Sequence, residues 1–154
     1  KALLPFNEYA FRHWSETSSS GWKGASIEKQ ERLNDNKSLK LNLKSARSAS
    51  RMVLLLPKES NLKSFNLGSL EIQTVLSTWG FYHGYYVIYL NGVYDKKVEL
   101  TLNFETSQKE VNGYLIDIST KLPNHLDELY EARSGIFSPV HTGDQAILIK
   151  KITI

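Results

Sequence analysis

Four histidines are the residues best suited to metal or acid–base chemistry, and none of them completes a known catalytic motif. His125 and Asp127 have the His-x-Asp spacing that opens some di-zinc sites, but such a site also needs an adjacent Glu-Glu pair, which the sequence lacks. Asp127 is better interpreted as the capping-box residue of a short helix after Asn124. His141 and Asp144 have no Gly-x-Ser-x-Gly elbow beside them and indicate a tight turn. Because cysteine is also absent, thiolate zinc sites and cysteine nucleophiles are excluded, and we do not expect catalysis by this chain.

Six aromatic side chains between residues 79 and 89 offer a second kind of site. The group consists of Trp79, Phe81, Tyr82, Tyr85, Tyr86 and Tyr89. Aromatic rings exposed on a β-sandwich can stack on sugar rings, and we expect exposure mainly at Trp79, Phe81 and Tyr82, which precede the regular strand. The strand itself, residues 85–90, must turn at least half of the group toward a core. A core role and a sugar-binding platform both stay open.

The stretch from Lys97 to Pro123 predicts the element around which the fold is built. Apolar and polar residues alternate from Val98 to Glu105, which is the two-residue side-chain period of a strand. A polar loop ends at Asn112-Gly113, where a positive φ is easily adopted, and apolar residues follow at 114–116 and 118. We therefore predict a β-hairpin with a core-facing apolar row that other strands must cover.

The rest of the chain predicts an all-β fold, an antiparallel β-sandwich of about seven to nine strands with one short helix near residues 124–132. Further strands are expected at residues 37–44, 52–56, 85–90 and 146–154, and a short hairpin at residues 65–74 turning at Gly68-Ser69. Residues 26–33 indicate at most a short helical turn capped by Ser26. Residues 1–36 are interpreted as a lead-in with a candidate first strand at Tyr9–Trp14, and residues 37–154 as the sandwich, in a single domain overall.

The composition is that of one ordinary globular domain, with 154 residues, 41% hydrophobic and 23% charged. No run approaches the ~18 apolar residues that a membrane span needs. The net charge of +3 is concentrated in residues 1–64, with twelve basic against six acidic side chains, and is interpreted as a solvated strand face. Without a denser patch or a recognisable module, we expect no nucleic-acid partner. Since the sequence begins at Lys1 and its only methionine is Met52, we expect a piece of a longer or processed protein.

Several short pieces follow one another in a distinctive order from Leu39 to the C-terminus. They are LNLKSAR (41–47) followed by Arg51 and an apolar strand, the hairpin at 65–72, YYVIY (85–89), VELTL (98–102), DIS (117–119) before LP (122–123), and Pro139, Gly143-Asp144 and the strand ILIKKITI. In this order they resemble the C-terminal extracytoplasmic domain of membrane-integrated di-zinc aminopeptidases, the group of the endoplasmic reticulum metallopeptidases, the vacuolar membrane proteases and their bacterial relatives. The sequence departs from that pattern in having Ala46 where a turn proline is usual, and in separating Arg133 from Pro139.

The resemblance implies a non-catalytic accessory domain that packs on or gates an upstream catalytic domain. It implies zinc in the parent's catalytic domain and no cofactor in this fragment. The implied partners are the parent's own catalytic and transmembrane regions, with room for a glycan or peptide ligand. The implied location is the extracytoplasmic side of a membrane, either the periplasm or cell exterior in bacteria or an organelle lumen.

No catalytic or metal-binding residue is carried over by the resemblance. The matched positions are expected to be turn and scaffold residues whose Asp and Ser side chains bond nearby backbone. These positions are Arg47, Asp117, Ser119, Pro123 and Asp144. The alternative function is a carbohydrate-binding module that uses the rings of Trp79, Phe81 and Tyr82.

Overall fold

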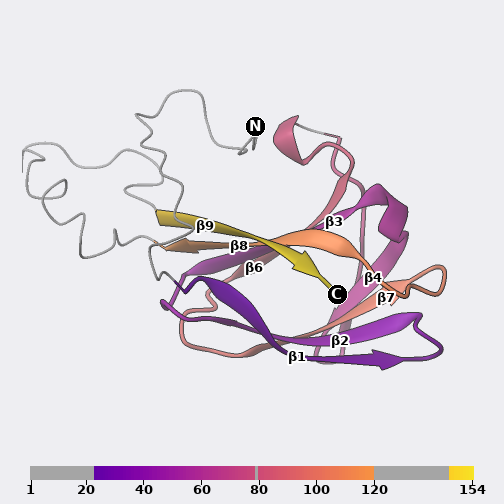
Figure 1. Ribbon diagram of the computed structural model, residues 1–154, viewed down its shortest axis with the longest axis horizontal. Coiled ribbons are helices and arrows are strands. Elements are labelled where there is room, and N and C mark those ends of the chain that lie inside the picture. Colours follow the sequence, from indigo (N-terminus) through magenta and orange to yellow (C-terminus); the bar gives the residue numbers. More distant parts are fainter. Residues whose placement is uncertain (1–22, 79, 120–145) are drawn as a thin grey trace, which may run out of the picture.

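The computed structural model describes residues 23–78, 80–119 and 146–154, without the side chain of Phe81. In this part the chain forms nine strands in two antiparallel sheets that pack face to face (Figure 1). Sheet A has the strand order β1-β2-β7-β4-β5, and sheet B has the order β6-β3-β8-β9. The strands are β1 (Ala25–Leu33), β2 (Ser38–Ser45), β3 (Arg51–Pro57), β4 (Leu62–Leu67), β5 (Leu70–Gln73), β6 (Tyr85–Asn91), β7 (Val98–Phe104), β8 (Asn112–Ser119) and β9 (Ala146–Thr153). The predicted antiparallel β-sandwich is confirmed.

The main core lies between the two sheets and is built from alternate residues of their central strands. Sheet A contributes Leu39, Leu41 and Leu43 of β2 and the core-facing side chains of β7. Sheet B contributes Met52, Leu54 and Leu56 of β3. All of these β2 and β3 side chains are fully buried. Each such side chain contributes roughly 1.5–3 kcal/mol by leaving water, so these rows hold the sheets together.

The outer faces of the two sheets differ in polarity. Sheet B carries a second apolar cluster on its outer face, with Val53 and Leu55 of β3 and Ile116 and Ile118 of β8 buried. Because β3 also faces the main core, it is apolar on both sides, as the uninterrupted run from Met52 to Leu56 predicts. The outer face of sheet A is polar instead.

The central hairpin predicted from residues 97–123 is wrong, because β7 and β8 belong to different sheets. β7 pairs with β2 and β4, whereas β8 pairs with β3 and β9. The loop between them crosses from sheet A to sheet B, and the Arg32 side chain of β1 holds it by donating to the carbonyls of Gln108 and Lys109, both at 2.6 Å. The alternation correctly predicts the core-facing row of β7, whereas on β8 Leu115 faces the main core and Ile116 and Ile118 lie in the outer cluster.

Gly113 also differs from its predicted role. It lies inside β8 and is not among the residues with positive φ. A Cβ atom built on it would lie 2.4 Å from the carbonyl oxygen of Leu55 on β3, so glycine is needed there for close strand approach. Gly68, by contrast, has φ +59° in the tight turn between β4 and β5, as predicted.

The short helical turn predicted at residues 26–33 is wrong as well, because Ala25–Leu33 form β1. β1 pairs with β2 along its length, with one irregularity between Ile27 and Lys29. Long-range pairing has overridden a weak local signal. The candidate strand at Tyr9–Trp14 and the helix near residues 124–132 lie outside the described residues. None of the helices in the described part is long and apolar enough to cross a membrane.

Candidate functional site

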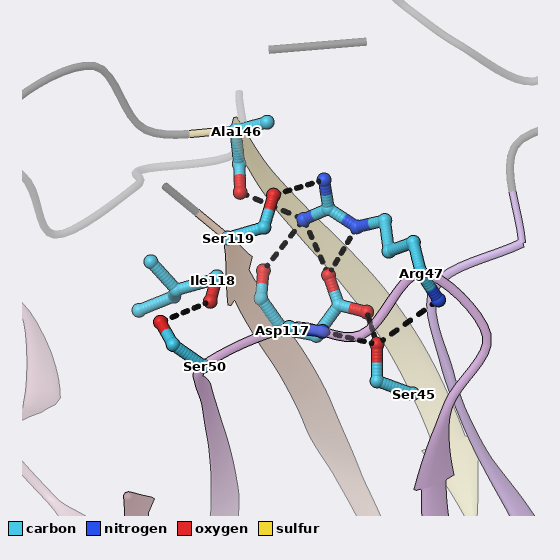
Figure 2. A network of polar contacts seen from close by, with 8 residues as sticks. Ser45, Arg47, Ser50, Asp117, Ile118, Ser119 and Ala146 are labelled. Carbon is cyan, nitrogen blue, oxygen red and sulfur yellow. Dashed lines mark hydrogen bonds and ion pairs between the residues drawn. The ribbon is translucent and has the colours of Figure 1, made fainter. Parts of the chain in front are cut away.

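A polar network around Arg47 joins the two sheets at one end of the sandwich (Figure 2). Arg47 lies in the turn after β2, and Asp117 lies on β8 with a side chain that is 0% exposed. The guanidinium Nε donates to Asp117 Oδ1 at 2.7 Å, and Nη2 donates to the same oxygen at 2.5 Å. Nη1 donates to Ser119 Oγ at 2.8 Å, and Nη2 also reaches the carbonyl of Ala146, the first residue of β9, at 2.7 Å. One side chain in the connection from sheet A to sheet B therefore binds two strands of sheet B.

Ser45 completes the network from the end of β2. Its Oγ donates to Asp117 Oδ2 at 3.0 Å and accepts from the backbone N–H groups of Arg47 and Ala49 at 3.3 and 3.1 Å. The hydroxyl thus shapes the turn that presents Arg47 and at the same time satisfies the second carboxylate oxygen. Gly24 lies beside the network: a Cβ on it would crowd the Leu148 side chain at 3.2 Å and make an ordinary contact with Asp117 Oδ2 at 3.5 Å.

This network of Ser45, Arg47, Asp117 and Ser119 has a structural role, and we call it the clamp because it holds the two sheets together. Both oxygens of the Asp117 carboxylate accept hydrogen bonds, and the Arg47 side chain is only 19% exposed. A buried carboxylate is tolerated when it is paired and fully hydrogen-bonded, as it is here. With its acceptors occupied, Asp117 is poorly placed to act as a general base or to hold a metal ion.

The partners of these residues differ from those expected from the sequence. Asp117 was predicted to bond nearby backbone, yet its side chain binds residues 70 and 72 positions away, and Ser119 accepts from Arg47 over 72 positions. Ser45 and the Ala146 carbonyl were missed by sequence reasoning. The Ser-x-Arg spacing was a usable signal for Ser45, whereas a backbone carbonyl leaves none. Pro123 and Asp144 lie outside the described residues.

The predicted aromatic platform is only partly visible. Trp79 lies outside the described residues, and nothing is described of the Phe81 side chain. Tyr82 is half-buried against the outer face of sheet B, where its ring meets Tyr89 edge-on with centroids 6.4 Å apart and planes at 86°. Burial, together with the neighbouring Tyr89, raises the pKa of Tyr82 to about 12. Tyr89 itself is 55% exposed.

The other tyrosines of this group pack on one face or the other of sheet B. Tyr85 lies on the outer face and meets Tyr114 edge-on at 6.3 Å, while Tyr86 packs against the main core. Of the four rings that the structure describes, Tyr86 packs against the main core, Tyr82 and Tyr85 pack against the outer cluster, and Tyr89 is exposed.

Metal-binding candidates are few in the described part of the chain. Of the four histidines only His83 lies within it, and no group of three or more His, Cys, Asp or Glu side chains is gathered there.

Comparison of the chain with known proteins found no matching family model, no matching curated protein and no matching solved structure.

Proposed function

We propose that this chain is a non-catalytic β-sandwich accessory domain of a membrane-bound, zinc-dependent aminopeptidase. It packs on or gates the catalytic domain upstream, on the extracytoplasmic side of the membrane. Zinc belongs to the parent's catalytic domain, and the accessory domain needs no cofactor.

The observation that carries this proposal is the meeting of three matched positions in one network. Arg47 and the pair Asp117 and Ser119 come from two separate pieces of the ordered pattern, and the Arg47 guanidinium donates to both residues of β8. A scaffold role explains why such residues are present together. The clamp fixes one sheet relative to the other, which gives a rigid body suited to packing against a second domain.

The coding sequence upstream of Lys1 tests the proposal directly. We expect a His-x-Asp motif and a Glu-Glu pair, followed by several hydrophobic spans and then by this domain. An upstream sequence without that metal-binding set would contradict the parentage.

The purified chain provides a biochemical test of its non-catalytic role. With zinc and aminoacyl-p-nitroanilide substrates, we expect no hydrolysis above a buffer control. Hydrolysis that survives further purification and is abolished by a chelator would overturn the assignment.

A second candidate function is glycan binding, favoured by the exposed Tyr89 ring beside Tyr82. An edge-on pair with one exposed ring offers a surface for a sugar ring, and Trp79 and Phe81 are close in sequence. On a glycan array, binding should be lost in Trp79→Ala and Tyr89→Ala but retained in Tyr94→Ala, whose ring is equally exposed at 55%. Absence of binding by the unchanged chain would remove this candidate.

A further inference from the structure

β1 and β9 are edge strands of the two sheets (Figure 1). An open groove of about 440 Å³ lies between them. Ile27, Glu28, Lys29 and Gln30 line it from β1, and residues 150–153 line it from β9. Edge strands carry backbone donors and acceptors that no neighbour uses, so an edge beside a groove is a natural place for another strand to bind.

β9 is the least protected of the four edges in the described structure. β1 is interrupted at Glu28 and carries charged or amide side chains at five successive positions, 28–32. β5 has only four residues, and β6 is partly covered by a bridge between Leu76 and Tyr86. β9 has eight residues in unbroken register with β8, and within the described residues it pairs with no other strand. It lacks the bulge and the shortness of other edges, and its two lysines, Lys150 and Lys151, discourage a second basic strand but not an acidic one.

The register identifies the backbone groups that face outward from β9. Val111 and Ile154 exchange both of their hydrogen bonds, which marks them as a hydrogen-bonded pair. Such pairs alternate in an antiparallel ladder, so Ile152, Lys150 and Leu148 also direct their N–H and C=O groups toward β8. The N–H and C=O groups of the alternate residues point away from β8. These are Ile147, Ile149, Lys151 and Thr153.

The charge of the groove indicates what kind of strand would bind there. Lys150 and Lys151 are exposed and make no ion pair with any residue that the structure describes, and Lys29 is 3.8 Å from Glu31 at an exposed site. Glu28 is held by Lys97 at 2.8 Å, so its charge is already compensated. Consecutive strand residues point to opposite faces, so Lys150, on the face of Ile152, is directed to the groove side, and Lys151 to the other face of sheet B. The groove therefore presents one uncompensated positive charge, at Lys150, which favours a carboxylate.

We propose that β9 binds an extended acidic peptide segment of another protein as an added strand of sheet B. The segment's backbone pairs with the outward groups of Ile147, Ile149, Lys151 and Thr153. Carboxylates at alternate positions of the segment lie on the same face as Lys150, and one of them faces that lysine. This binding mode goes beyond the proposed accessory role and does not depend on it.

The test uses the whole chain and a synthetic peptide of four Glu-Val repeats with blocked ends. In an NMR titration at millimolar peptide, we expect shifts and slower hydrogen exchange at the amides of Ile147, Ile149, Lys151 and Thr153. A peptide of the same sequence with every backbone amide N-methylated has no N–H group to donate to β9 and should bind at least tenfold more weakly. No perturbation of β9, or equal binding by the N-methylated peptide, would overturn the proposal.

Two variants separate backbone pairing from charge. Lys151→Pro removes an outward N–H without touching the bonds to β8, and should abolish binding, whereas Lys151→Gln keeps the N–H and should weaken it only a few-fold. Lys150→Glu should weaken binding more than Lys63→Glu, which makes the same charge change at an exposed position on β4. Equal effects of these two Glu variants would overturn the acidic preference. If light scattering shows a dimer that Lys151→Pro abolishes, the edge binds a second copy of this chain and the proposed partner is wrong.

Discussion

Asp117 shows at the scale of one residue how a buried charge can hold two sheets together. Replacing Asp117 with Ala would leave the guanidinium of Arg47, 19% exposed, without its carboxylate. Removing one member of a buried pair typically costs about 3–5 kcal/mol of unfolding free energy. We expect a loss of that order in urea denaturation followed by tryptophan fluorescence.

Two controls identify the cause of that loss. The double variant Arg47→Met with Asp117→Leu should be less destabilised than Asp117→Ala, because it leaves no unpaired charge. Glu99→Gln breaks the exposed Lys40–Glu99 pair, with a 3.0 Å separation, and should change stability by less than about 1 kcal/mol. If Asp117→Ala were no worse than Glu99→Gln, the clamp would be without energetic importance.

Tyr82 predicts a pH dependence whose sign follows from its raised pKa. In the folded chain Tyr82 titrates at about 12, and in the unfolded chain a tyrosine titrates at about 10. As pH rises above about 10, the unfolded state loses this proton first, so the stabilisation is present below pH 10 and is lost on the way to pH 12. The Tyr82→Phe variant should therefore lose less stability than the unchanged chain between pH 10 and 12.

A matched control for this titration is Tyr94→Phe, since the Tyr94 ring is 55% exposed. Its stability curve should run parallel to that of the unchanged chain across the same interval. In Tyr82→Phe, the ultraviolet absorbance of phenolate should lose the titration step near pH 12. A phenolate step near pH 10 for Tyr82 would contradict the expectation.

The site residues were accessible to sequence reasoning singly but not as a set. Arg47, Asp117 and Ser119 were singled out by their place in an ordered pattern, yet their contacts span 70 and 72 positions. Only the crossing of the chain between the sheets brings them together. Ser45 acts through two backbone N–H groups and one carboxylate, a combination that depends on the same topology.

At the scale of the elements, Gly113 limits how close β8 can come to β3. The Cβ of Gly113→Ala would lie 2.4 Å from the Leu55 carbonyl oxygen, so one strand must move. Forcing extra volume into a packed site costs about 1–3 kcal/mol. We expect a loss in that range in thermal and urea unfolding, with the amides of β3 and β8 losing hydrogen-exchange protection.

Gly68→Ala is the control that separates crowding from backbone strain. No atom lies within 4 Å of the Cβ added at residue 68, but φ is +59°. Only the left-handed backbone conformation should therefore lower the free energy of unfolding, by about 1–2 kcal/mol. Exchange protection in β3 and β8 should stay unchanged in this variant. A similar loss of protection at β3 in both variants would contradict the close-approach explanation.

Strand positions could be predicted from the sequence, whereas strand partners could not. The two-residue period marks which side chains of β2 and β7 face the core, and those rows are buried as expected. The same period does not indicate which strands pair with each other. The sequence therefore predicted a hairpin of β7 and β8, although the two strands belong to different sheets. β1 was missed because an edge strand with one wet face carries few apolar residues, and its stability comes from pairing with β2.

At the scale of the whole molecule, the outer face of sheet B behaves as a second core. Ile116 on that face is 1% exposed, while Leu102 in the main core is 0% exposed. If the two clusters contribute alike, Ile116→Ala and Leu102→Ala should each cost about 2–5 kcal/mol, since both remove buried methyl groups. Thr101→Ala, on the outer face of sheet A, should change stability by less than about 0.5 kcal/mol. The urea midpoints of the three variants measure these losses. If the outer face of sheet B contributed no more than an exposed surface, Ile116→Ala would lose as little stability as Thr101→Ala.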